Sequence, residues 1–172
     1  NMKKILLISL VIASIIFISG CVEPTGTYKL NYRGTELLFN SNLNEAKNIT
    51  VYPDNETLKE TLFGYNVAGI QFAYYKNDTE APFYAKSLIS FASKYTKMNI
   101  VRWGYDMSGN IFYSMLNETD QNANATVEEP VIMLLGPAYS NETKIVVENN
   151  VVMVYAKDLT MRAGEYAGYT DF

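Results

Sequence analysis

A single cysteine is the residue with the clearest chemistry in this chain. Cys21 follows Ile18-Ser19-Gly20, and small residues before a cysteine are typical of a lipobox, in which a peptidase cleaves the chain and the cysteine thiol takes a lipid. Lys3 and Lys4 precede an apolar run over 5–19, the order of parts expected in a secretion signal. That run has 15 residues, fewer than the roughly 20 that a membrane-spanning helix needs. We therefore expect residues 1–21 to be a lipoprotein signal peptide, with an uncleaved membrane anchor as the alternative.

Six Asn-X-Thr sequons form a second set of residues whose type and spacing suit a modification. Their asparagines fall mostly in segments that we interpret as exposed loops or helix starts. They are candidate glycosylation sites if the chain is exported in a host with the necessary enzymes. Two have other interpretations, because Asn55 could cap a helix and Asn141 could occupy a turn. The six are Asn48, Asn55, Asn77, Asn117, Asn124 and Asn141.

A short loop is the candidate ligand site. Gly136, Pro137 and Tyr139 follow the apolar run 131–135, which predicts a strand buried on both faces. Ligands of open α/β sheets bind at the carboxyl ends of strands. Gly136 would let a ligand approach the backbone, and the Tyr139 ring would stack on it. A tight turn that leaves the sheet is the alternative interpretation.

Catalysis is harder to support, because the chain has no histidine. Ser–His and Cys–His nucleophilic sites and histidine-containing zinc sites are thereby excluded. A carboxylate pair could still cleave glycosides, but no spacing singles out two acids, and a solvated acidic loop explains them as well. We assign no catalytic residue, metal or cofactor. The acids concerned are Asp106, Glu118, Asp120, Glu128 and Glu129.

Aromatic pairs are the last candidate group. On a surface they could bind sugars or a protein partner, and in a domain without disulfides they also suit the core. The pairs are Trp103 with Tyr105, Tyr74 with Tyr75, and Tyr166 with Tyr169.

Composition predicts that a single acidic domain follows the signal peptide. Removal of residues 1–21 takes away Lys3 and Lys4 and no acid, so the net charge moves from −4 to −6. This charge disfavours nucleic-acid binding. We expect residues 22–26 to be a tether and 27–172 a single domain, whose 14 Tyr and 8 Phe supply core area without disulfides. Thr170 and Asp171 are typical of a helix start, which favours truncation at the carboxyl end.

The elements that must position these residues are short strands alternating with helices. This order favours an α/β domain with helices packed on a mixed β-sheet and β-hairpins near both ends, with α+β as the alternative. Asp54 or Asn55 would cap the first helix, and Gly64 would end it. The expected segments are a hairpin over 27–40, strands over 49–52, 67–75, 111–116 and 131–135, a helix over 55–63, a helix from about 81 to 97 or somewhat further, and a hairpin over 144–156. Residues 100–105 suit either the end of that helix or a strand.

Four stretches resemble small exported archaeal proteins of unknown function. They are Tyr28–Gly34 (YKLNYRG), Asn48–Pro53 (NITVYP), Pro130–Pro137 (PVIMLLGP) and Asn141–Thr143 (NET). The resemblance implies an α/β lipoprotein-like domain that continues past Phe172, and it assigns no activity and no functional residue.

Together these patterns predict a lipoprotein anchored to the outer face of the cell membrane through Cys21. We expect a binding or structural surface module, with a cell-envelope protein or glycan as partner and no nucleic acid. The alternatives are a carboxylate-based extracellular enzyme acting on glycans and a small solute-binding module.

Overall fold

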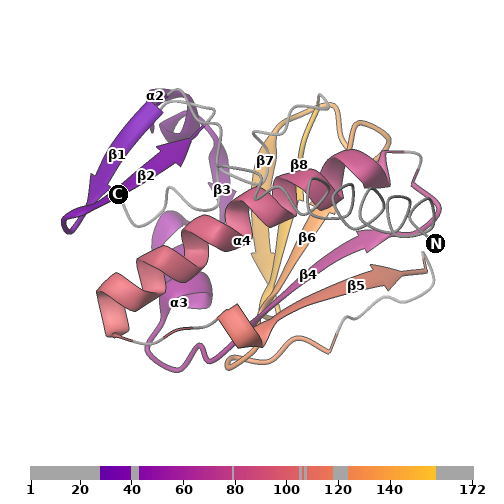
Figure 1. Cartoon of the computed structure of the whole chain (residues 1–172). Helices are drawn as coiled ribbons and strands as arrows, with labels where there is room; N and C mark the ends of the chain where they lie inside the picture. Colours follow the sequence, from indigo (N-terminus) through magenta and orange to yellow (C-terminus); the bar gives the residue numbers. More distant parts are fainter. Residues whose placement is uncertain are drawn as a thin grey trace, which may run out of the picture.

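The structure contains a six-stranded mixed sheet and a separate two-stranded sheet (Figure 1). It is a computed structural model that describes residues 28–39, 43–78, 80–104, 106, 108–117 and 124–157. The strand order of the large sheet is β3-β7-β8-β6-β4-β5. The predicted mixed sheet with packed helices is therefore confirmed.

Four neighbouring strands of the large sheet are parallel. They are β8 (Val151–Tyr155), β6 (Val131–Leu135), β4 (Ile70–Tyr75) and β5 (Ile111–Leu116). β7 (Lys144–Glu148) is antiparallel to β8, and β3 (Thr50–Tyr52) is parallel to β7. The direction reverses at the predicted second hairpin, where Asn149 and Asn150 both take positive φ angles of 51° and 63°. Asparagine tolerates this conformation, which matches the twist of a hairpin.

The first predicted hairpin forms as well, but it does not join the large sheet. β1 (Tyr28–Tyr32) and β2 (Thr35–Phe39) pair only with each other. Their turn uses Arg33 and Gly34 at positive φ, and Asn31 Oδ1 accepts a hydrogen bond from the Gly34 N–H at 2.7 Å. The short helix α2 (Leu43–Lys47) follows.

The hairpin packs on a helix through a buried lysine. The Lys94 ammonium lies 5.4 Å from the centre of the Phe39 ring. It also donates to Ser90 Oγ at 2.6 Å. A cation against an aromatic face, with a hydroxyl acceptor beside it, allows the charge to be buried.

Both long helices begin and end at residues that explain their limits. α3 (Asn55–Phe63) is capped by Asp54, so Asn55 is the first helical residue and not the cap. α4 (Ala81–Trp103) continues beyond residue 97 through the segment that suited either a helix end or a strand, because Met98 and Val101 extend its apolar stripe into the core. Gly104 ends it with a φ of 67°, a conformation that favours glycine.

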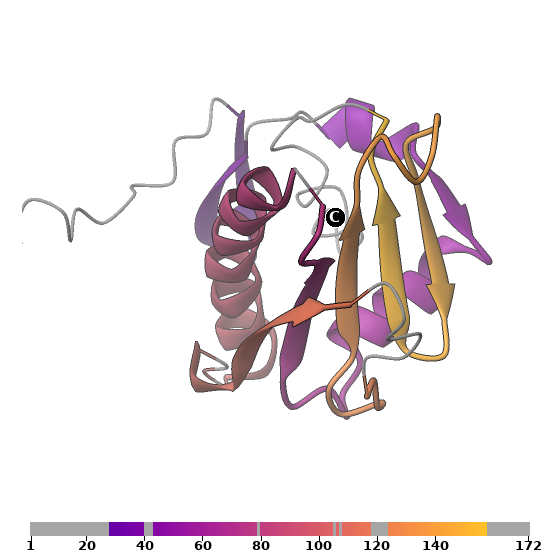
Figure 2. The ribbon, with the colours of Figure 1, turned by 90° about the vertical axis from the view of Figure 1, so that its right-hand side faces the viewer.

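The core lies on one face of the large sheet, between the sheet and the helices (Figure 2). Phe72 of β4 meets Phe91 of α4 with ring centres 5.6 Å apart, and Phe63 of α3 meets Tyr95 of α4 at 5.2 Å. The strand residues of this core alternate along each strand and share one face by register: Ile70, Phe72, Ile132, Leu134, Ile145, Val147, Val152 and Val154.

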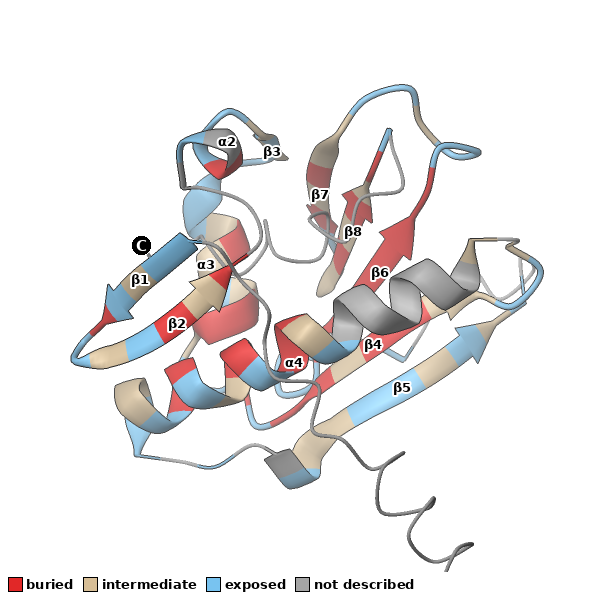
Figure 3. Cartoon of the chain, turned by 45° about the horizontal axis from the view of Figure 1, so that its top comes forward, coloured by how far each residue is buried: buried red, intermediate tan, exposed pale blue. Residues whose placement is uncertain are grey.

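β6 is buried along its whole length, as its apolar run predicted (Figure 3). Its alternate residues Val131, Met133 and Leu135 point to the second face of the sheet, away from the core cluster. Their neighbours Met153 and Tyr155 on β8 are only half-buried there. The second face is thus apolar and in part open to solvent.

The buried hydroxyl of Tyr95 gives a test of the contact between the helices. It donates to the backbone oxygen of Leu62, and burial raises the pKa of Tyr95. The substitution Tyr95→Phe leaves that oxygen without its partner and is expected to lower the free energy of unfolding by about 1–2 kcal/mol. Urea unfolding measures this, and an unchanged midpoint would show that the hydrogen bond contributes nothing.

The cap of α3 gives a pH-dependent test. The Thr57 N–H donates to Asp54 Oδ1 at 2.7 Å and holds the pKa of Asp54 below its ordinary value. A lowered folded-state pKa stabilises the fold above the unfolded-state value of about 3.9, and this stability is lost as pH falls through the folded-state pKa.

We therefore expect wild-type protein to lose more thermal stability between pH 7 and pH 3 than Asp54→Asn, which caps without ionising. Asp54→Ala should be less stable than Asp54→Asn at both pH values. Thermal unfolding followed by circular dichroism tests this, and equal losses in wild type and Asp54→Asn would contradict it.

Candidate functional site

The carboxyl ends of the parallel strands lie side by side at one end of the sheet. Register pairs Tyr75 with Leu116 and Leu135 with Tyr155 at the last positions of their strands. The connection that follows β4 runs to β5, toward one outer strand of the sheet. The connection that follows β6 runs to β7, toward the opposite outer strand. In open α/β sheets, ligands bind at the carboxyl ends of the strands where the connections change side. The candidate site therefore lies at the carboxyl ends of β4 and β6.

The predicted ligand loop lies at this point. The Tyr139 N–H donates to the Gly136 oxygen at 2.9 Å, so the loop is also the tight turn that was the alternative interpretation. Gly136 itself is buried, whereas Pro137 and Tyr139 are exposed. A ligand would therefore meet the Tyr139 ring and not the glycine backbone.

Tyr139 rests on a second tyrosine that the sequence did not single out for this role. Its ring centre is 5.4 Å from that of Tyr75, the last residue of β4. Tyr155 ends β8 on the same face of the sheet, with Leu135 between it and β4. We call Tyr75, Tyr139 and Tyr155 the tyrosine edge. Tyr75 and Tyr155 are the last residues of two parallel strands, and this shared position is the sequence signal that could have identified the tyrosine edge.

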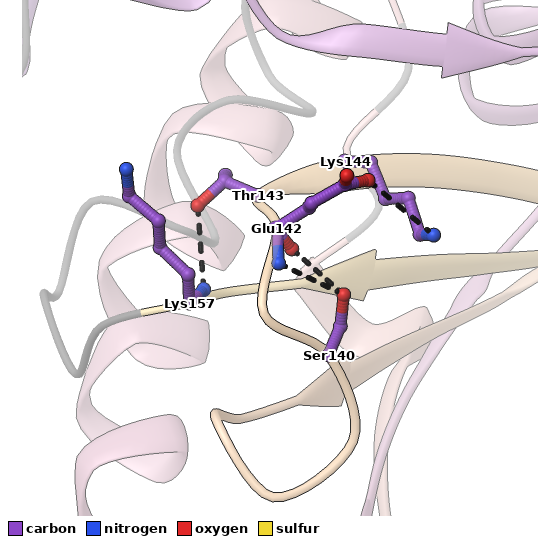
Figure 4. A network of polar contacts seen from close by, with 5 residues as sticks. All are labelled: Ser140, Glu142, Thr143, Lys144 and Lys157. Carbon is purple, nitrogen blue, oxygen red and sulfur yellow. Dashed lines mark hydrogen bonds and ion pairs between the residues drawn. The ribbon is translucent and has the colours of Figure 1, made fainter.

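Polar groups fix the loop on the β7 side of the tyrosine edge (Figure 4). Ser140 Oγ donates to the Glu142 oxygen at 3.0 Å and accepts from the Glu142 N–H at 3.1 Å. The Lys144 ammonium lies 5.5 Å from the centre of the Tyr155 ring and 3.8 Å from a Glu142 carboxylate oxygen. Thr143 Oγ1 accepts from the Lys157 N–H at 3.3 Å, which ties the loop to the end of β8.

A carboxylate with one unsatisfied oxygen lies on the β4 side of the same edge. Asp78 Oδ1 accepts from the Glu80 N–H at 2.9 Å before α4 begins. Its Oδ2 atom is buried and has no hydrogen-bond partner. A buried acceptor of this kind favours a water or a ligand donor.

The six sequon asparagines are all exposed, and four of them gather at this edge. Asn48 precedes β3, Asn77 follows β4, Asn117 follows β5, and Asn141 lies in the connection between β6 and β7. Asn55 and Asn124 lie at the opposite end of the sheet, where α3 begins and where the chain approaches β6. Every candidate glycosylation site thus has the solvent access that a glycan requires.

The three candidate acids that the structure describes do not join the tyrosine edge. Asp106 precedes β5, and Glu128 and Glu129 precede β6, so all three lie at the amino ends of the parallel strands. The Glu128 backbone oxygen accepts from Ala68 at 2.8 Å and from Gly69 at 3.0 Å, a structural role. Glu118 and Asp120 lie outside the described residues. In the described part of the chain, no group of three acids suits a metal ion.

Tyr74 and Tyr75, the one aromatic pair that lies wholly within the described residues, face opposite sides of the sheet. Tyr74 packs against the core, whereas Tyr75 faces the opposite side in the tyrosine edge. Trp103 is exposed and contacts Tyr65, a residue that the sequence analysis missed, with ring centres 5.5 Å apart. Tyr105, Tyr166 and Tyr169 lie outside the described residues.

The lipobox and the anchor also lie outside the described residues, as do Cys21, the tether over 22–26 and the proposed helix start at Thr170. Among the residues that the structure describes, no helix combines the length and hydropathy needed to cross a bilayer. Comparison of the chain with family models, with curated proteins and with solved structures finds no significant match.

Proposed function

We propose that this protein is a lipid-anchored, extracytoplasmic binding module that recognises a glycan of the cell envelope. The observation that carries the binding role is the exposed Tyr139 ring. It packs against Tyr75 with a tilt of 34° between the ring planes, at the carboxyl ends of β4 and β6. Aromatic faces beside hydroxyl and carboxylate groups suit sugars, whose rings present both apolar and polar sides. Ser140 and Glu142 supply such groups at this edge.

The anchoring role rests on the signal and lipobox ending at Cys21 and on the absence of any second cysteine that could pair with it. The resemblance to exported archaeal proteins supports the same location. Carboxylate catalysis receives no support from the candidate acids Asp106, Glu128 and Glu129, which lie at the opposite end of the parallel strands from the tyrosine edge.

Lipidation is tested by intact-mass measurement of protein extracted from the native membrane. We expect a mature chain that begins at Cys21 and carries lipid on its thiol, because the residues before it suit the processing peptidase. Cys21→Ser should block the modification, and peptide mapping of the same sample reports glycans at the six sequons. A free thiol at Cys21 in the native protein would favour the uncleaved anchor.

Glycan binding is tested with the full chain in lipid nanodiscs on an array of cell-envelope polysaccharides. Loss of a central aromatic contact costs about 1–2 kcal/mol, so Tyr139→Ala should weaken binding about tenfold. Tyr65→Ala is the matched control, because Tyr65 is 83% exposed but lies next to Trp103, away from the tyrosine edge. Equal binding by wild type and Tyr139→Ala would remove the tyrosine edge as the site.

A further inference from the structure

β3 and β5, the two outermost strands of the large sheet, differ in how they are protected against pairing with a further strand. β3, at one edge, has three residues and is followed directly by Pro53, which cannot donate a hydrogen bond to another strand. β5, at the other edge, has six residues with the sequence IFYSML and contains no proline and no charged residue. Natural proteins block exposed edge strands with such residues, because an open edge is a template for another strand.

The outer side of β5 carries regularly spaced backbone groups beside which the described part of the chain places no further strand. The Lys76 N–H donates to the Leu116 oxygen, which shows that Leu116 turns its backbone groups toward β4. Backbone direction alternates along a strand, and the β4–β5 register is continuous for six residues. Ile111, Tyr113 and Met115 therefore turn their N–H and C=O groups outward.

Large apolar side chains surround this edge on both faces of the sheet. Tyr113 is 53% exposed and Met115 68% exposed on the face that carries α4, and Phe112 is 45% exposed on the second face. The ring of Tyr113 is already oriented by stacking on Phe72, with ring centres 5.6 Å apart. A strand placed beside β5 would cover all three side chains. Figure 3 shows β5 as the exposed outer strand beside the buried β4.

We propose that β5 pairs antiparallel with β5 of a second copy of this chain, so that the two large sheets join into one. The backbone directions determine the register: Tyr113 faces Tyr113 of the second copy, and Ile111 faces Met115. This arrangement has a two-fold axis that passes between Tyr113 of one copy and Tyr113 of the other. It uses every outward backbone group from Ile111 to Met115.

The backbone pattern of β5 favours a second copy as the occupant, because an antiparallel copy of the same strand presents matching outward groups at Ile111, Tyr113 and Met115. The net charge of −4 makes two copies repel over most of their surface, so contact is expected where charge is absent. β5 is an uncharged segment, and the symmetric register places no like charges opposite each other within the strands. Because the β3 edge is short and ends at proline, pairing through β5 stops at a dimer and does not propagate.

Single-cysteine cross-linking tests the register in the full-length Cys21→Ser chain, solubilised in detergent. Tyr113→Cys places two thiols on residues that face each other at a Cα separation of about 5.5 Å, within the range for a disulfide. We expect a covalent dimer on mild oxidation. Tyr52→Cys is the matched control, because Tyr52 is a tyrosine 52% exposed on the opposite edge strand, and it should remain monomeric.

Sedimentation of the same chain without an added cysteine tests the association itself. We expect a monomer–dimer equilibrium, and Tyr113→Lys should raise its dissociation constant about tenfold or more, because two like charges then face each other. Tyr52→Lys should leave it unchanged, and circular dichroism checks that both variants fold. A monomer at all concentrations, equal cross-linking at positions 113 and 52, or a dimer insensitive to Tyr113→Lys would each overturn the proposal.

Discussion

A continuous run of aromatic contacts crosses the molecule from α3 to the outer strand of the sheet. Phe63, Tyr95, Phe91, Phe72 and Tyr113 follow one another with ring centres between 5.2 and 5.7 Å apart. The described part of the chain contains no cysteine, so packing of this kind stabilises the domain without disulfides. These rings join both long helices to β4, and they also orient Tyr113 at the edge.

The position of that core explains where the surface features lie. Because the core cluster draws on one face of the large sheet, alternate residues of β4, β6 and β8 point to the second face, which is partly open. Tyr75 and Tyr155 reach that face at the carboxyl ends of their strands. The exposure of the tyrosine edge therefore follows from a sheet that the described helices cover on one side, whereas the open edge of β5 follows from the strand order.

Local sequence signals located most of the elements, because each depends on a few neighbouring residues. The strands over 111–116 and 131–135 have the predicted bounds. The cap at Asp54 and the turn at Asn149 and Asn150 lie where short polar residues indicated them. The end of α4 was left open beyond residue 97, because the contacts of Met98 and Val101 with the core involve residues far away in the sequence.

The sequence by itself determined the signal and lipobox pattern, the acidic charge, the six sequons and the alternation of strands with helices, since these are properties of composition and local order. It also indicated the loop at Gly136 and Tyr139. Only the tertiary structure decided that the first hairpin stands apart from the large sheet, that Tyr75 meets Tyr139, and that β5 and β3 are the edges. Strand order and the pairing of distant side chains depend on packing across the whole chain, and no local pattern encodes them.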